Sequence, residues 1–324
     1  MRFSRFGVFI LLLLTVFIGS NCGYYNRVMA RKNLVDGSKA YKDRKFKDAE
    51  QLFRAAVARD PNGQYTEGKV AQLFLARTLH SEYIGDRGHK DWAEAAIQEY
   101  QKVLAQDPND QSSYKAIASL YENLQMTDQW LDWVTKRSQN TGLPPEQRAE
   151  ALTSLAAKKN SCANDITDTE QTKKKVTKDG KPAYQYVKPA NAADYDNLKK
   201  CIEDGTGLID QAVALETDRV RNATSLNPKT MSDADLKSNL DYLKVFESAR
   251  SYKTSLLFQA SFLAEMDGRT ADHDNFKKQG DDAKAKFLEL SDVVKKLQAE
   301  IDERAAAAEA ADKTNSNSNA NAAK

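Results

Sequence analysis

Residues 49–61 read AEQLFRAAVARDP, and residues 96–108 read AIQEYQKVLAQDP. Each stretch places a small residue, an aromatic residue, a second apolar residue and a proline at successive spacings of 4, 3 and 5. Spacings of three and four put side chains on one face of a helix, and the residue before a proline disfavours helix. The stretches therefore predict two similar helices, each ended by an Asp-Pro pair. The residues concerned are Ala49, Phe53, Ala56 and Pro61, and then Ala96, Tyr100, Val103 and Pro108.

The residues before the first stretch extend the pattern to a pair of helices. Gly37 lies 12 residues before Ala49, and small residues at both positions allow two helices to cross closely. With Phe53, Ala56 and Pro61, these residues resemble the tetratricopeptide repeat, and the resemblance covers about residues 30–140. A third unit carries Tyr114, Ile117, Ala118 and Tyr121 at the family's positions. The resemblance implies antiparallel helix pairs stacked into a solenoid that binds other proteins.

The second half of the chain also predicts helices, with one interruption. A helix is expected from about Pro145 to Cys162 and another from about Ala192, with a basic insertion at about 165–190 between them. Within the insertion, Asp179 and Gly180 separate two short runs that contain β-branched and aromatic residues, which predicts a small β-hairpin.

Beyond the insertion, apolar residues recur every three or four positions in two long stripes, from Tyr242 to Leu263 and from Phe276 to Ile301. Asp267, Gly268 and Arg269 separate the stripes, so an antiparallel helix pair is expected. Helix-breaking residues are scarce, with 14 Gly and 7 Pro in 324 residues, which agrees with a helical fold.

The predicted fold class is therefore all-α: a tetratricopeptide-like solenoid of helical hairpins with a small β-hairpin insertion and a long C-terminal antiparallel helix pair. The C-terminal tail, residues 305–324, has too little apolar surface to fold and is expected to be disordered. The expected segments are a leader (1–21), the repeats (22–140), a degenerate hairpin with the basic insertion (141–231), the long hairpin (232–304) and the tail (305–324).

The first residues predict export. Arg2 and Arg5 precede an uncharged run from Phe6 to Asn21, which is the order of a secretory signal. The run ends just before Cys22 and is similar to a bacterial lipoprotein signal, in which the cysteine receives a diacylglycerol and becomes the new N-terminus. This resemblance implies a protein anchored by lipid at Cys22 to a bacterial membrane, the outer membrane facing the periplasm. Ordinary cleavage after Ser20, or an uncleaved anchor, remains the alternative.

The three cysteines agree with export. If Cys22 carries lipid, Cys162 and Cys201 are left to pair in an oxidising compartment. They flank the basic insertion, where a disulfide would join two helix ends. The alternative is a pair of buried free thiols. Neither cysteine has a CxxC partner or a histidine nearby, so no metal site is expected.

Charge and motifs argue against nucleic acid and catalysis. Without Arg2 and Arg5 the 48 basic residues fall to 46, equal to the 46 acidic ones, whereas nucleic acid requires a basic face. His80, His89 and His273 fall in different hairpins. No GxSxG elbow or phosphate-binding glycine loop occurs. We therefore expect no enzymatic activity and no cofactor.

These patterns favour a membrane-anchored periplasmic scaffold that binds other envelope proteins, in a role of the outer-membrane-assembly or wall-enzyme-adaptor type. The alternative is a solute- or glycan-binding lipoprotein that uses aromatic residues near Tyr121, Trp130 and Trp133, although their helical spacing equally fits packing between repeats. The basic insertion is either a solvated flap or a contact for an anionic protein, lipid headgroup or wall polymer. Its lysines are Lys173, Lys174, Lys175, Lys178, Lys181 and Lys188.

Overall fold

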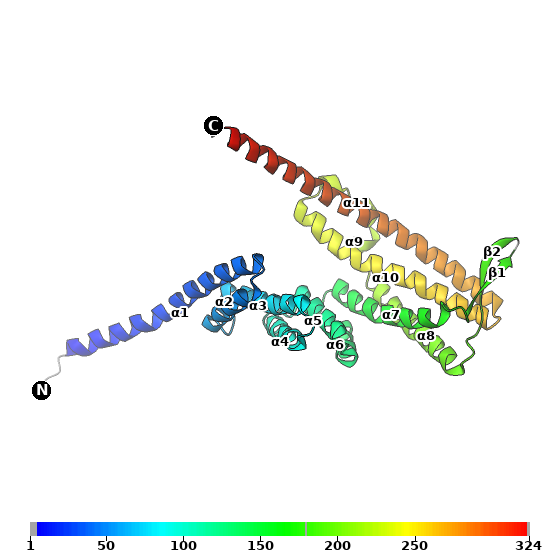
Figure 1. Cartoon of the computed structure of the whole chain (residues 1–324), viewed down its shortest axis with the longest axis horizontal. Helices are drawn as coiled ribbons and strands as arrows, with labels where there is room; N and C mark the ends of the chain where they lie inside the picture. The colour runs from blue at the N-terminus through cyan, green and yellow to red at the C-terminus, as the bar shows by residue number, and fades with distance from the viewer. Residues whose placement is uncertain (1–4, 179, 323–324) are drawn as a thin grey trace. The chain divides into compact units, whose positions relative to one another are not determined.

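A computed structural model describes the backbone of residues 5–178 and 180–322 and the side chains of residues 23–178 and 180–310. The described chain is helical except for turns and one two-stranded antiparallel sheet, so the predicted all-α class is confirmed (Figure 1). The chain forms two compact units, residues 1–130 and 131–324.

The first unit is a succession of antiparallel helices. Each helix packs against the next one in the sequence from the first to the fifth, and α1 also contacts α3. This is the predicted arrangement of tetratricopeptide-like hairpins. The helices are α1 (Arg5–Lys42), α2 (Phe46–Arg59), α3 (Thr66–Gly85), α4 (Lys90–Gln106) and α5 (Gln111–Asn123), and α6 (Thr127–Gln139) begins in this unit.

The residues that define the repeat pattern form the contacts between these helices. Ala49, Phe53 and Ala56 of α2 are each fully buried. At Gly37 of α1, an added Cβ would lie 2.7 Å from Cε1 of Phe53, closer than real Cβ atoms approach. The close helix crossing therefore depends on the absence of a side chain at Gly37. In the second repeat the corresponding α4 residues are also buried: Ala96, Tyr100 and Val103.

The Asp-Pro pair at the end of α2 organises the following turn. The Asp60 carboxylate, on a residue that is 5% exposed, accepts hydrogen bonds from the backbone N–H groups of Gln64 and Tyr65, each at 2.8 Å. Pro61 cannot continue the helix, and the aspartate satisfies donors that the turn leaves free. The pair therefore ends one helix and fixes the start of the next.

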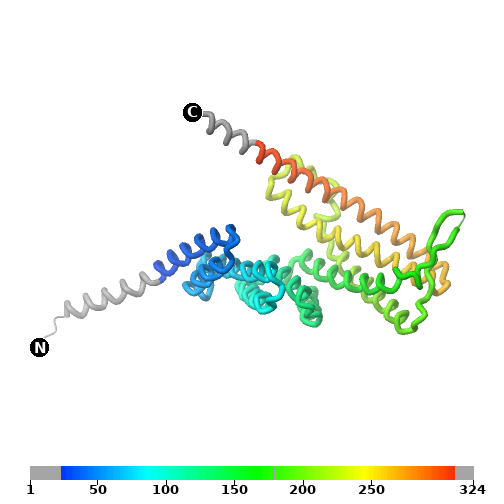
Figure 2. Tube along the Cα trace, in the orientation of Figure 1, coloured from blue at the N-terminus to red at the C-terminus, as the bar shows by residue number. Residues whose placement is uncertain are grey.

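The second unit is a bundle around one long helix. α10 packs against α7, α8 and α11, and the β-hairpin lies beside the end of α10 near the α10–α11 turn (Figure 2). The elements are α7 (Pro145–Thr167), β1 (Lys173–Lys178), β2 (Lys181–Tyr186), α8 (Ala192–Ala214), α9 (Asp218–Arg221), the 3-10 turns η1 (Ala223–Ser225) and η2 (Pro228–Thr230), α10 (Asp233–Met266) and α11 (Thr270–Ala322).

The two helical hairpins expected in the second half of the chain belong to this one unit. α7 packs against α8 and α10 packs against α11, and both pairs lie within residues 131–324. They share a core, to which α7, α8, α10 and α11 contribute Leu152, Ile209, Leu243 and Leu297. Each helix pair would leave an apolar face exposed if it stood alone.

The C-terminal segment departs from the expectation at one point. The expected loss of structure from residue 305 does not occur at that point, because residues 305–310 continue α11 with exposed side chains. Four consecutive alanines occupy positions 305–308. Alanine has the highest helix propensity of any residue, so these residues extend a helix that has already formed. The expected tail beyond residue 310 lies outside the described side chains.

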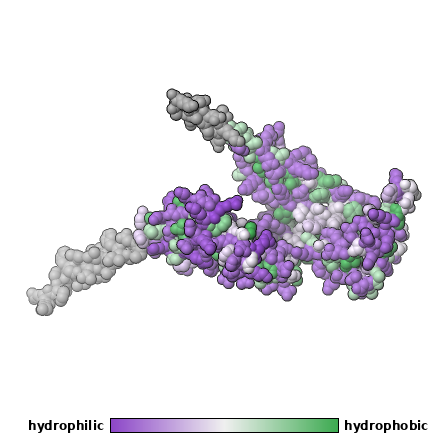
Figure 3. All heavy atoms as spheres, viewed as in Figure 1, coloured by the Kyte–Doolittle hydropathy of each residue, from purple (hydrophilic) through white to green (hydrophobic). Residues whose placement is uncertain are grey.

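Within the described residues, no helix is both long enough and apolar enough to cross a membrane. The face drawn in Figure 3 is dominated by hydrophilic side chains in each unit, with hydrophobic ones in small separate groups.

Candidate functional site

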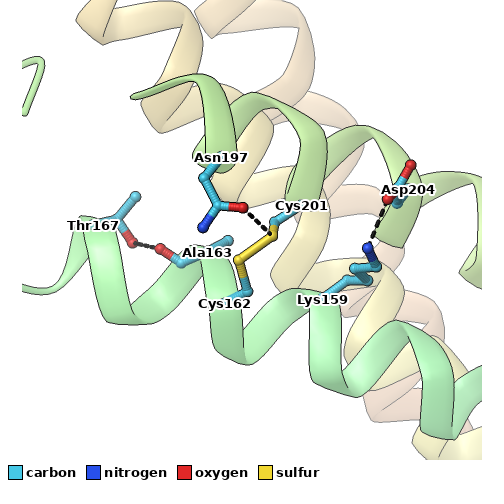
Figure 4. The surroundings of a disulfide bond; sticks show 7 residues. All are labelled: Lys159, Cys162, Ala163, Thr167, Asn197, Cys201 and Asp204. Atoms are coloured by element: carbon cyan, nitrogen blue, oxygen red, sulfur yellow. Dashed lines mark hydrogen bonds and ion pairs between the residues drawn. A yellow bond between two sulfur atoms is a disulfide. The ribbon is translucent and has the colours of Figure 1, made fainter. Parts of the chain in front are cut away.

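The basic insertion and its surroundings in the second unit form the candidate site. The disulfide lies at its base: Cys162 on α7 is bonded to Cys201 on α8, with 6.1 Å between their Cα atoms (Figure 4). Cys22, the expected lipidation site, lies outside the described side chains.

The disulfide is set in a packed and salt-bridged junction. Cys201 is 4% exposed and belongs to an apolar cluster that includes Leu198, Ile202 and Ala163. One turn along each helix, Lys159 Nζ of α7 lies 2.6 Å from Asp204 Oδ2 of α8 (Figure 4). The two helices that carry the insertion are therefore held together covalently, by packing and by charge.

The insertion itself is a regular β-hairpin. β1 and β2 pair antiparallel, with Lys173 opposite Tyr186 and Lys178 opposite Lys181. Only residues 179 and 180 lie between the last pair, and Gly180 has φ of +75°, the left-handed conformation that a two-residue hairpin turn requires. The strand-forming runs around Asp179 and Gly180 thus predicted the hairpin correctly; Asp179 lies outside the described residues.

Several contacts fix the hairpin to the bundle. The Tyr186 ring stacks on Phe262 of α10, with 3.8 Å between ring centroids and 13° between planes. Thr172, which is 2% exposed, places its hydroxyl 2.8 Å from the Ile166 carbonyl oxygen at the end of α7. Lys173 Nζ lies 2.7 Å from Asp168 Oδ1. The start and the end of the hairpin are therefore both attached.

Just after the hairpin, a charged cluster connects the chain to the α10–α11 turn. Lys188 Nζ lies 2.8 Å from Asp267 Oδ1, and the Tyr195 hydroxyl of α8 also donates to that oxygen. Burial pushes the pKa of Asp267 upward, but the hydrogen bonds from Lys188 and Tyr195 outweigh it, and the pKa is lowered. The hydrogen bond to Asp267 in turn raises the pKa of Lys188. Asp267 and Lys188 are thus both ionised at neutral pH.

A cavity of about 300 Å³ lies between the hairpin, α7 and α10. Amides, hydroxyls, one acid and one lysine supply most of the lining, and three aromatic rings supply the rest. The cavity therefore combines hydrogen-bonding groups with flat apolar surfaces. The lining residues are Asn164 and Thr167 of α7, Asp168 just after it, Lys173 and Tyr186 of the hairpin, and Ser255, Phe258, Gln259 and Phe262 of α10.

The polar side chains of the cavity form a network across the two helices. Gln259, which is 5% exposed, accepts from the Thr167 hydroxyl at 3.0 Å and donates through Nε2 to Asn164 Oδ1. The Ser255 hydroxyl donates to Asn160 Oδ1 at 2.8 Å. Burial raises the pKa of Tyr186 further above neutral pH, so its hydroxyl remains a hydrogen-bond donor. The arrangement suits binding of a small polar molecule.

Sequence reasoning missed this cavity. Asn164 and Gln259 are 95 residues apart, and each lies among other polar residues of its helix, so neither stands out in the sequence. Only the packing of α10 on α7 brings them together. A buried polar residue requires a partner, but the sequence does not show that Gln259 is buried.

The aromatic residues considered for ligand binding are largely enclosed. Trp130 is 6% exposed, so little of its surface is available to a ligand. Tyr121 and Trp133 are half-buried. The described residues contain no group of three or more His, Cys, Asp or Glu side chains that could hold a metal ion.

The three histidines occupy separate positions. His80 lies on α3 with Nδ1 3.4 Å from the Tyr100 hydroxyl, and burial lowers its pKa. His89 stacks on Trp92 at the surface, with 4.1 Å between ring centroids, and His273 lies beside Asp274. His80 is therefore partly enclosed within the first unit, beside Tyr100.

Comparison with known proteins adds little to this description. No protein-family model matches the chain, and no curated protein matches it. Among solved structures, that of Pseudomonas aeruginosa pilF is similar over 82% of this chain and 97% of its own, with 14% identity and a TM-score of 0.30. A similarity at that score carries no argument about function.

Proposed function

We propose that the protein is a membrane-anchored periplasmic scaffold that binds other envelope proteins, in an outer-membrane-assembly or wall-enzyme-adaptor role. The observation that carries this proposal is the packing of the first unit, where Gly37 lies against Phe53 as the tetratricopeptide pattern requires. Arrays of such helix pairs present extended surfaces on which peptides or partner helices bind.

A binding role is preferred to a catalytic one because of how the cavity hydroxyls are used. The Thr167 hydroxyl hydrogen is shared between the Ala163 carbonyl and Gln259 Oε1, and Ser255 donates to Asn160. Neither hydroxyl is hydrogen-bonded to a histidine, lysine or carboxylate that would activate it as a nucleophile. The described cavity therefore supports recognition of a ligand and not attack on it.

The proposed partner surface is testable by site-specific photocrosslinking in intact cells. Val35 of α1 and Ile84 of α3 are apolar and 59% and 57% exposed, so a crosslinking amino acid is tolerated at either position. We expect a discrete protein adduct from at least one of them. Leu288 of α11, 50% exposed in the second unit, is the matched control. Equal adducts from all three positions, or none from Val35 and Ile84, would argue against a scaffold surface on the first unit.

The membrane anchor is a separate part of the proposal and rests on the leader sequence. Cys22→Ala, or treatment with the lipoprotein signal peptidase inhibitor globomycin, is expected to leave the precursor unprocessed. The measurement is metabolic labelling with palmitate together with the electrophoretic mobility of the chain. Labelling that persists in the Cys22→Ala chain, or processing that is unaffected by both treatments, would contradict lipidation.

The cavity supports a second candidate function, a solute- or glycan-binding lipoprotein. Its 300 Å³ volume suits one sugar-sized molecule, with amides to hydrogen-bond hydroxyl groups and the half-buried Tyr186 beside them. Calorimetric titration with mono- and disaccharides, including wall fragments, tests it. If a ligand binds, Tyr186→Phe is expected to weaken it, whereas Tyr184→Phe, outside the cavity, is the matched control. Absence of binding across the panel leaves the scaffold as the sole proposal.

A further inference from the structure

The exposed part of the β-hairpin is strongly basic. Residues 173–188 contain six lysines, no arginine and a single acid, Asp179. Lys173 and Lys188 are neutralised by Asp168 and Asp267 at the base of the hairpin. The other four lysines are exposed, and Lys174 donates to the Glu170 carbonyl oxygen at 2.9 Å. The remaining three have no carboxylate within 4 Å among the described residues; these are Lys175, Lys178 and Lys181. The positive charge is therefore concentrated toward the turn.

The strand register shows that this charge is unfavourable to the hairpin itself. Lys178 and Lys181 lie directly opposite each other, and like charges at such positions destabilise a strand pair. A two-stranded sheet is marginal even without this repulsion. The contacts of Tyr186, Thr172 and Lys173 with the bundle, at the base of the hairpin, stabilise the strand pair against this repulsion. Charge repulsion that is kept in one element and offset by contacts with the rest of the fold is typical of a functional surface.

An exposed aromatic ring accompanies the lysines. Tyr184 is 54% exposed, although it lies on the same strand as the stacked Tyr186. It pairs across the strands with Lys175, and its ring centroid lies 4.7 Å from Lys173 Nζ. Tyrosine rings beside lysine ammonium groups are typical of surfaces that lie at the boundary between lipid headgroups and acyl chains.

We propose that the hairpin is a second membrane contact, in which Lys175, Lys178 and Lys181 bind the phosphate headgroups of an anionic bilayer and Tyr184 enters the interface. The proposal rests on the membrane attachment proposed above. The use of lysine alone favours a bilayer over a protein partner, because arginine is the side chain that recognises carboxylates with a fixed geometry. The lysines lie on both faces of the strand pair. This distribution fits a diffuse anionic surface better than a single docking face on a protein partner.

An environment-sensitive fluorophore on the hairpin tests this contact in the full lipidated chain. Thr177 is exposed and lies between Lys175 and Lys178, so Thr177→Cys carries the probe. Thr224→Cys, exposed on η1 of the same unit, is the matched probe position. We expect the emission of the Thr177 probe to shift to the blue in vesicles containing phosphatidylglycerol but not in vesicles of phosphatidylcholine alone. The Thr224 probe is expected to show no shift in either.

Charge variants then identify the residues that make the contact. Each lysine near an anionic surface contributes roughly fivefold to binding at low salt, so replacing all three lysines with Gln weakens the contact by about a hundredfold. This change is expected to abolish the blue shift, as is salt at about 0.5 M. The matched control replaces three exposed lysines outside the hairpin, Lys237, Lys284 and Lys295, with Gln and is expected to keep the shift.

The outcomes separate this inference from the proposed function. If the chain floats with vesicles and the Thr177 probe is unshifted, the membrane anchor stands and the hairpin contact is wrong. Equal shifts at Thr177 and Thr224, or equal losses in the two triple-lysine variants, also overturn it. A chain that does not float with vesicles at all contradicts the anchor. A shift produced by an acidic protein in place of anionic lipid would assign the hairpin to a protein partner and overturn the bilayer contact.

Discussion

The rings of Tyr186 and Phe262 lie parallel, 3.8 Å apart between centroids, and join the last residue of the β-hairpin to the long helix α10. Tyr184, two residues earlier on the same strand, is 54% exposed. The two tyrosines therefore differ in environment although they lie on the same strand, two residues apart. This difference makes them a matched pair for measuring what holds the hairpin on the bundle.

We predict that Tyr186→Ala lowers the free energy of unfolding by about 1–2 kcal/mol, because it removes a stacked ring and its buried area. Tyr184→Ala is expected to change stability by less than about 0.5 kcal/mol, as surface substitutions do. Urea unfolding of both variants measures the difference. Amide hydrogen exchange should also become faster in residues 173–186 of the Tyr186 variant alone. Equal effects of the two substitutions would show that the stack does not hold the hairpin.

Replacing two glycines with alanine is expected to change the stability of the protein in opposite directions. In Gly37→Ala, the new methyl group would lie 2.7 Å from Cε1 of the fully buried Phe53, so a destabilisation of about 1–3 kcal/mol is expected. In Gly207→Ala, nothing lies within 4 Å of the new atom, and the interior of α8 gains about 1 kcal/mol from helix propensity. Thermal unfolding of each variant measures the sign. Stabilisation by Gly37→Ala would mean that the two helices do not cross closely at that point.

The local patterns in the sequence predicted the local structure well. The 4-3-5 spacing in residues 49–61 identified α2, because one face of that helix is buried against its neighbours. The Asp-Gly pair at 179–180 identified the hairpin, because a two-residue turn restricts its own conformation. In both cases the information lies within a few residues of the element.

The arrangement of the second unit could not be read in the same way. The stripe along α10 was assigned to a single contact with α11, but α10 also packs on α7 and α8. Lys253, which falls within that stripe, instead pairs with Asp210 of α8. A helix that is buried on several faces does not reveal which neighbour covers which face. The cavity lined by Gln259 follows from that packing and was missed for the same reason.

The dependence of stability on pH isolates the contribution of His80, which is half-buried. Burial lowers the pKa of His80 below its ordinary value of 6.5, so the folded protein resists protonation that the unfolded chain accepts. Stability is therefore undiminished above pH 6.5 and falls as the pH decreases below 6.5 toward the lowered pKa. His80→Gln is expected to reduce this loss, measured as the change in unfolding temperature between pH 7.5 and pH 5. His89→Gln, at an exposed position, is the control and should retain it; identical pH profiles for all three proteins would contradict a role for His80.

The disulfide gives the last prediction. Cys162 and Cys201 are 39 residues apart in sequence, and their Cα atoms are 6.1 Å apart in the fold, so the bond closes a loop that contains the whole hairpin. Closing a loop of that length restricts the unfolded chain, and double substitution with Ser is expected to lower the free energy of unfolding by about 2–4 kcal/mol. Reductant should destabilise the native chain by a similar amount and leave the double-Ser variant unchanged, which makes that variant the control.

The redox state of the native chain is measured directly by mass. Cys162 and Cys201 should resist alkylation in the absence of reductant, and the denatured chain should gain two alkyl groups only after reduction. Because Cys201 is 4% exposed, alkylation must be carried out in denaturant; otherwise burial alone would protect a free thiol. Two alkyl groups on these cysteines without reductant would show that the protein keeps free thiols. The base of the hairpin would then be held only by packing and by the Lys159–Asp204 pair.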